Sequence, residues 1–392
     1  MRRALVLPLF LSALAAAGCG GKNETTPGDP ATLGIKGTDA GAARGLGFPG
    51  LATKNTTRVG GADPVADAAA VAQAVYPAAG PGTNPQAVTL VDKGDWRAGI
   101  AAAALMAPPL RAPILLSDGT SLPAATSSAL QVLAPTGSKP AGGAQIIRVG
   151  DVGQAAGLKT TDIKGANPFA LAGAIDSFLA AARGSSSDRV LVVSADQPSF
   201  AMPAAAYAAK SGDAVLFVHR DSVPPETRAA LASHRQPKIY LLGPPSVIGP
   251  KVETGLKKLG KVVRIGGPDP VQNAIAFARY ADGAFGWGVV DPGHGLVFAA
   301  AGADPQTAAA AAPLSASGTY GPLLLVGDAA RVDSALAQFL LDIQPGYAKD
   351  PVRGVYNHGW IIGDEKAVSI AAQSQIDRLL EISPVNQKNA TP

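Results

Sequence analysis

Cysteine and aromatic residues are scarce in this chain. Cys19 is the single cysteine among 392 residues, which excludes a disulfide bond within the chain and a cysteine-based metal site. Aromatic residues make up 5% of the sequence and charged residues 16%, whereas the apolar set reaches 47%. A core of this chain must therefore be built from small, closely packed aliphatic side chains, many of them alanine.

The residue patterns of common catalytic and metal sites are also missing. The histidines lack metal-ligand spacing to one another; they are His219, His234, His294 and His358. The sequence has no phosphate loop, no nucleophile elbow and no second cysteine. These absences predict a protein that is not an enzyme and that holds no metal or cofactor.

The N-terminus has the pattern of a bacterial export signal. Arg2 and Arg3 precede an uncharged stretch over residues 4–17, too short for a membrane-spanning helix of about 20 residues. The stretch ends in small residues directly before Cys19, which resembles the lipobox of bacterial lipoproteins. We predict that residues 1–18 are a signal peptide and that Cys19 carries the lipid anchor. The alternative is an ordinary secretory signal with an incidental cysteine.

Residues 19–54 are rich in glycine, with several proline and threonine residues and no apolar periodicity. This composition predicts a flexible tether, which holds the folded part on the order of 30 Å from the anchor. At the other end, residues 383–392 form a polar tail. Loss of Arg2 and Arg3 with the signal peptide lowers the formal net charge by two from +4, so whole-chain charge is a weak guide to partners.

The rest of the chain contains one motif three times. The copies are TTRVGGADP at residues 56–64, TTDIKGANP at 160–168 and VVRIGGPDP at 262–270. Each copy has a β-prone stretch, a glycine turn, and an acid or amide before proline. Asp63, Asn167 and Asp269 are therefore predicted as helix N-caps, with proline at the first helical position. The copies define repeats over residues 55–158, 159–260 and 261–382.

Each repeat then alternates short apolar strands with helices. The first strands are expected at 88–91, 190–193 and 296–299, and alanine-rich helices at 98–106, 202–209 and 306–314. Second strands are expected at 113–118, 215–221 and 323–328, and last strands at 146–150, 239–243 and 360–363. Short, wholly apolar strands that alternate with helices indicate parallel sheets covered on both faces. We therefore predict an α/β fold of three tandem Rossmann-like or Toprim-like parallel-sheet repeats around a pseudo-threefold axis.

The second strand of each repeat ends in an acid. We take Asp118, Asp221 and Asp328 to be equivalent residues with a structural task at the strand ends. A polar contact to a ligand is the alternative, because ligands of α/β proteins bind at the carboxyl ends of the strands.

The triple pattern resembles the cell wall binding repeat 2 family. The resemblance extends over residues 56–382 and rests on the runs Arg58 to Asp63 and Arg264 to Asp269, the strand at 112–116, and the ending at 362–369. Polar positions depart from the family pattern, as at Asp162, where the other two repeats have arginine. The resemblance implies three repeats around a pseudo-threefold axis and non-covalent binding of anionic, teichoic-acid-like polymers. Together with the predicted lipid anchor, it predicts a location on the outer face of the cytoplasmic membrane, facing the cell wall.

The charge distribution adds a candidate binding surface. Residues 210–264 contain ten basic and four acidic residues, a net charge of +6, whereas residues 265–392 carry −5. Such a basic surface attracts polyanions. The candidate polymer-binding residues are Arg58, Arg235, Lys251, Lys257, Lys258, Lys261 and Arg264. The alternative is a solvated helix face that keeps an alanine-rich protein soluble.

Three functions remain open at this point. The sequence favours a lipid-anchored cell-envelope protein that binds an anionic polymer, with no nucleic acid partner. A solute-binding or surface-receptor lipoprotein that uses clefts between the repeats is the alternative. An enzyme is the third, although only the tether and the tail lie outside the repeats.

Overall fold

The computed structural model describes residues 50–80, 82–317 and 321–385. Cys19, the predicted signal peptide and most of the predicted tether lie outside the described residues. Within these ranges, no helix is both long and apolar enough to cross a lipid bilayer.

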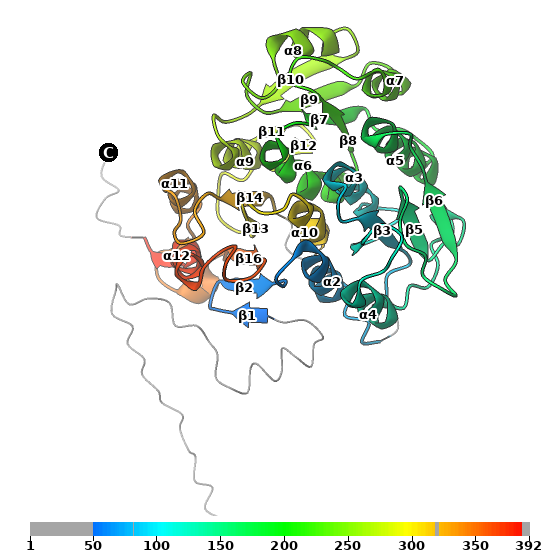
Figure 1. The fold of residues 1–392 in the computed structure, drawn as a ribbon. Helices are drawn as coiled ribbons and strands as arrows, with labels where there is room; N and C mark the ends of the chain where they lie inside the picture. The colour runs from blue at the N-terminus through cyan, green and yellow to red at the C-terminus, as the bar shows by residue number, and fades with distance from the viewer. Residues whose placement is uncertain (1–49, 81, 318–320, 386–392) are drawn as a thin grey trace, which may run out of the picture. The chain divides into compact units, whose positions relative to one another are not determined.

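Three small sheets form the framework, each with the same strand order (Figure 1). Sheet 1 runs β4 (Ile114–Ser117), β3 (Val88–Asp92), β5 (Ile146–Val149), β6 (Thr160–Ile163). Sheet 2 runs β8 (Ala214–Val218), β7 (Arg189–Ser194), β9 (Lys238–Leu242), β10 (Lys261–Ile265). Sheet 3 runs β14 (Leu323–Val326), β13 (Gly295–Ala300), β16 (His358–Ile362), β2 (Thr56–Val59), β1 (Gly50–Ala52). Within these three sheets all pairs are parallel except β1 with β2, so the predicted α/β fold of parallel-sheet repeats is confirmed.

The sheets are offset from the sequence repeats by one strand. The strand that opens repeat 2, β6, pairs with β5 of the preceding repeat, and β10 pairs with β9 in the same way. The strand that opens repeat 1, β2, pairs with β16 near the end of the chain, with Ile361 opposite Arg58. Figure 1 shows this junction, where the blue β2 lies beside β16. The first strand therefore completes the sheet of the last repeat.

Helices of each repeat cover the sheets in a repeated manner. The outer helices are α2 (Pro64–Val75), α4 (Ala124–Leu133), α5 (Pro168–Arg183), α7 (Pro225–Ser233), α9 (Pro270–Arg279) and α11 (Ser334–Asp342). Each of the helices that follow an opening strand packs on the second strand of its own repeat: α2 on β4, α5 on β8 and α9 on β14. The last strands of repeats 2 and 3 are followed by α8 (Pro250–Leu256) and α12 (Ile370–Leu380).

Capping explains where the helices after the glycine turns begin. Asp63 accepts a hydrogen bond from the Ala66 amide at 2.9 Å, and Asp269 accepts one from Gln272 at 2.8 Å. Asn167 accepts from Phe169 and Ala170. Proline follows each cap at the first helical position, where it has no amide hydrogen to leave unpaired.

The alanine-rich helices lie at the centre of the fold (Figure 1). They are α3 (Trp96–Ala102) with its 3-10 continuation η1 (Ala103–Met106), α6 (Pro198–Ser211) and α10 (Gln306–Ala316), and each packs against the other two. Every residue from Phe200 to Ala209 is buried, as is every residue from Gln306 to Ser315. A helix that is apolar all round is a core helix, and alanine lets three of them approach closely.

Equivalent hydrogen bonds join each central helix to the next repeat. Arg97 of α3 donates to the Ala195 carbonyl after β7, and Ser199 of α6 donates to the Ala301 carbonyl after β13 at 2.8 Å. Gln306 of α10 donates to the Asp92 carbonyl at the end of β3 at 2.6 Å. The contacts run from repeat 1 to 2, from 2 to 3 and from 3 to 1, as a pseudo-threefold arrangement requires.

Candidate functional site

An open groove with basic side chains lies between the loop that leads into α7 and the helix α8. Its volume is about 580 Å³. Three cations, Arg228, Lys251 and Lys258, line it together with the hydroxyl-bearing Ser222 and Thr254. We call this surface the basic groove. Asp221 is the one carboxylate that lines it among the residues that the structure describes.

The helix α8 places two of these cations on the same side. Lys251 lies in its first turn, and Lys258 lies two residues beyond its last residue, Leu256, about two turns later. Apolar Val252 and Leu256 of α8 are buried against the sheet, which leaves both lysines exposed to solvent. Arg228 comes from α7, and its Nε donates to the Val223 carbonyl at 3.1 Å. The site thus combines side chains from two elements.

Two of the candidate residues are engaged with a carboxylate. Glu253 accepts Lys257 at 3.0 Å and Arg264 at 2.8 Å. Hydrogen bonds from Lys257 and then Arg264 hold the pKa of Glu253 below its ordinary value. Two of the ten basic residues of the segment are therefore paired with one of its four acids, away from the groove.

The remaining candidates lie apart from the groove. Lys261 opens the edge strand β10 and is exposed. Arg235 is exposed just after α7, with a positive φ of 55°. Neither residue forms an ion pair with any of the described residues. Arg228 lies in the basic segment, but nothing in the sequence places it opposite α8.

Arg58 is buried, with 7% of its surface exposed, and its nitrogen atoms are used within the chain. Its Nη1 donates to the carbonyls of Gly363 at 2.9 Å and Asp364 at 2.8 Å, and its Nη2 donates to Val368. Its Nε donates to Gln373 at 3.0 Å. These contacts attach β2 to the turn between β16 and α12. We therefore leave Arg58 out of the polymer site.

The position that Arg58 has in its repeat also explains why repeat 2 departs from the family pattern at Asp162. Arg264, the counterpart of Arg58 in repeat 3, donates to the Gly243 carbonyl at 2.7 Å. In repeat 2 the position is Asp162, and the arginine stands directly across the strand pair, at Arg148. Arg148 approaches Asp162 at 3.6 Å and donates to the Val152 carbonyl at 3.1 Å. The arginine therefore lies on the neighbouring strand, where the other two sheets have Ile361 and Leu241, and it still donates to the turn.

The acids at the ends of the second strands are equivalent in two repeats and not in the third. The amide of Asp118 donates to the Ser121 carbonyl, and Asp328 forms the same bridge with Arg331. In repeat 2 His219 makes this contact, with the Ser222 carbonyl, so the expected equivalence of Asp221 was wrong. The strand-end position of repeat 2 is His219, and Asp221 lies two residues further along the loop.

His219 forms a polar cluster with Asp196 at this strand end. Its Nδ1 lies 2.7 Å from Asp196 Oδ1, and the Arg220 amide donates to Asp196 Oδ2 at 3.0 Å. Partial burial acts against ionisation of Asp196, but the hydrogen bonds from His219 and Arg220 keep its pKa below the ordinary value. Nowhere in the described ranges, this cluster included, are three histidine, cysteine or acidic side chains arranged to hold a metal ion.

Comparison with known proteins identifies relatives by structure alone. No protein-family model matches the sequence, and no curated protein matches it. Cwp6 from Clostridium difficile matches with a TM-score of 0.64 at 17% identity, over 84% of this chain and 49% of Cwp6. Cwp8 from the same organism matches with a TM-score of 0.62 at 20% identity, over 83% of this chain and 52% of Cwp8. The chain spans about half the length of these proteins, and at such identities the likeness shows a common fold.

Proposed function

We propose that this protein is a non-catalytic, lipid-anchored component of the bacterial cell envelope that binds an anionic cell-wall polymer in the basic groove. The observation that carries the proposal is the arrangement of Arg228, Lys251 and Lys258 around one open groove. The resemblance of the repeats to cell wall binding repeat 2 supports it, as does the fold that the chain has in common with Cwp6 and Cwp8.

Charge alone binds such a polymer weakly at each contact. An ion pair at contact in water contributes on the order of 1 kcal/mol, so several must form together. The three cations of the groove can meet successive anionic groups along an extended chain. Ser222 offers a hydroxyl group that can donate to a phosphate or carboxylate oxygen, whereas the Thr254 hydroxyl donates to the Pro250 carbonyl at 3.0 Å.

The test reverses the charge of the groove. Changing Arg228, Lys251 and Lys258 to Glu should lower co-sedimentation with purified cell-wall polymer several-fold. Increasing salt should lower binding of the unchanged protein, because salt screens exposed charges. The melting temperature should change little, since surface substitutions usually shift stability by less than about 0.5 kcal/mol.

A matched control keeps the change in net charge the same. Lys349, Arg353 and Lys366 are exposed cations of repeat 3, and their reversal to Glu should leave binding unaltered. A second variant, with Lys257 and Lys261 changed to Glu, measures how much the basic residues outside the groove contribute to polymer binding. Equal binding by the groove variant and the unchanged protein would contradict the proposal, and binding that ignores salt would indicate a neutral sugar ligand.

The lipid anchor has its own test. Mass spectrometry of the mature N-terminus should show acylated Cys19, and Cys19→Ser should release the protein from membranes. A mature N-terminus at another residue, with an unmodified Cys19 thiol, would be incompatible with anchoring.

A further inference from the structure

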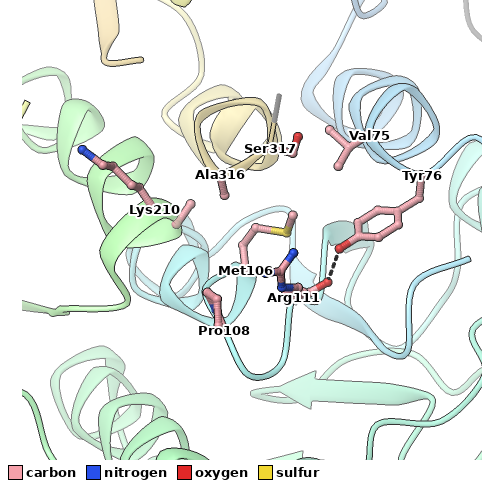
Figure 2. A pocket seen from close by; sticks show the side chains of 9 residues that line it. Val75, Tyr76, Met106, Pro108, Arg111, Lys210, Ala316 and Ser317 are labelled. Atoms are coloured by element: carbon pink, nitrogen blue, oxygen red, sulfur yellow. Dashed lines mark hydrogen bonds between the residues drawn. The ribbon is translucent and has the colours of Figure 1, made fainter. Parts of the chain in front are cut away.

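A second cavity lies where the central helices end. Its volume is about 420 Å³, within the usual range for small-molecule sites. Met106 is the last residue of η1, Ala209 and Lys210 lie in the last turn of α6, and Ala316 is the last residue of α10. We call this cavity the axial pocket, and Figure 2 shows its lining side chains.

The wall of the axial pocket is mostly apolar. Val75 of α2, Met106 and Pro108 supply its larger apolar side chains. Ala209 and Ala316 are small, and they leave the space open where a larger side chain in the last turn of α6 or α10 would fill it. Because all three repeats contribute, the pocket is a product of their assembly.

Two cationic side chains, Lys210 and Arg111, border the pocket, and they point in different directions. The Nζ of Lys210 lies 4.5 Å from the ring centroid of Trp287, and in Figure 2 it points away from the other lining residues. The Arg111 side chain lies between Met106 and Tyr76 in the same view. Among the residues that the structure describes, Arg111 has no carboxylate partner within ion-pair distance.

The backbone holds Arg111 in an unusual conformation. Its φ is +50°, a left-handed value that costs a residue other than glycine about 1–2 kcal/mol. The Tyr76 hydroxyl donates to the Arg111 carbonyl at 2.7 Å and fixes this conformation. Strained residues that the surroundings hold in place are concentrated at ligand sites.

Helix electrostatics explain why cations are found here. The C-terminal ends of α2, α6 and α10 meet at the pocket, and the last carbonyl groups of each helix carry partial negative charge. These ends favour cations and repel a bare anion. A bound anion must therefore be compensated by Arg111, whose guanidinium offers donors in a planar fork that suits a carboxylate.

We propose that the axial pocket binds a small amphiphilic organic anion, a carboxylate on an apolar body of about ten non-hydrogen atoms. The apolar part lies against Val75, Met106 and the alanine ends of α6 and α10, and the carboxylate meets Arg111. The ligand of this pocket differs from that of the basic groove, because a cavity of this size does not admit an extended polymer.

Octanoate is a suitable probe, with octanol, acetate and glucuronate as comparisons. In isothermal titration calorimetry, octanoate should bind to the whole protein. Octanol lacks the charge, acetate lacks the apolar body, and glucuronate carries hydroxyl groups that the apolar wall cannot pair, so each should bind at least about tenfold more weakly, or about 1.4 kcal/mol.

Arg111→Gln should weaken octanoate binding by at least about tenfold. Arg235→Gln is the matched control, since Arg235 is also an exposed arginine with a positive φ, 55°, and lies outside the pocket. Ala316→Phe provides a second variant that fills the cavity and should abolish binding. Melting curves without ligand verify that each variant is folded.

Equal octanoate affinity in Arg111→Gln and Arg235→Gln would overturn the proposal. So would tighter binding of glucuronate or octanol than of octanoate, or no heat of binding with octanoate. None of these outcomes depends on polymer binding, so this test and the test of the basic groove can fail independently.

Discussion

Asp67 is a buried carboxylate whose environment makes the stability of the fold depend on pH. It is 2% exposed at the start of α2, and its Oδ1 accepts the Gly61 amide at 2.8 Å. Burial raises its pKa from 3.8 to about 7, although the Gly61 amide favours the ionised form. In repeat 3 the same position is Asn273, whose side-chain oxygen faces the Gly267 amide. A neutral amide therefore serves the same turn.

The raised pKa of Asp67 makes the protein less stable as pH rises. Below about pH 4 the carboxyl is protonated in both states, and between about pH 4 and 7 only the unfolded state loses its proton. The free energy of unfolding should thus fall by up to about 1.4 kcal/mol per pH unit in this window. Urea unfolding of Asp67→Asn at several pH values should show a flatter profile and a gain in stability near pH 8.

His234 also makes the free energy of unfolding fall as pH rises, and it provides an internal control. Its ring is buried between two acceptors, Asp176 Oδ2 at 2.6 Å and the Ser187 carbonyl at 2.7 Å. Burial opposes the imidazolium, but the hydrogen bond and charge of Asp176 raise its pKa above 6.5 overall. This stabilisation is complete below pH 6.5 and is lost above it, so Asp67→Asn should retain a slope at alkaline pH. An unchanged slope between pH 4 and 7 would contradict the assignment to Asp67.

At the scale of elements, the contact between α3 and α10 leaves no space for a side chain at Gly99. A Cβ atom at Gly99 would lie 2.0 Å from Gln306 Oε1 and 3.1 Å from the Ala309 Cβ. The Gln306 amide nitrogen is held by the Asp92 carbonyl, so the side chain can move away only by giving up that bond. Close packing here is a condition for the three central helices to meet.

Gly99→Ala should therefore destabilise the protein by about 1–3 kcal/mol, as overpacked core substitutions do. Chemical denaturation measures the loss. Gly255→Ala in α8 is the matched control, because its nearest neighbour would be 3.9 Å away and alanine favours helix by up to about 1 kcal/mol. If Gln306 is the obstacle, Gly99→Ala combined with Gln306→Ala should cost less than the sum of the single changes. Additive costs would point to Ala309 instead.

At the scale of the whole molecule, the junction between the first and last repeats depends on β2. Asp377 of α12 accepts the Asn55 amide at 2.7 Å, and Arg58 joins β2 to the turn after β16. These contacts cross more than 300 residues of sequence. Their loss leaves buried carbonyl groups unpaired, which is costly.

Arg58→Ala should lower the free energy of unfolding by about 3 kcal/mol or more and leave polymer binding unaltered. Arg331→Ala, in which the arginine is exposed and pairs with Asp328, is the control and should cost less than about 0.5 kcal/mol. Hydrogen exchange should show that β2 and β16 lose protection first in Arg58→Ala. Stable Arg58→Ala with reduced polymer binding would return Arg58 to the polymer site.

The sequence by itself determined the repeated motif, the helices and main strands of each repeat, and the caps. These depend on neighbours within a few residues: apolar runs, glycine turns and an acid or amide before proline, as at Asp63 and Asn167. Only the tertiary structure decided which strands pair, because β2, β6 and β10 have the same local pattern whether they join their own repeat or the preceding one. It also decided which charges are free. Arg58 and Lys258 are both basic residues in the sequence, but burial against backbone carbonyls occupies the first, and exposure beside Arg228 leaves the second available.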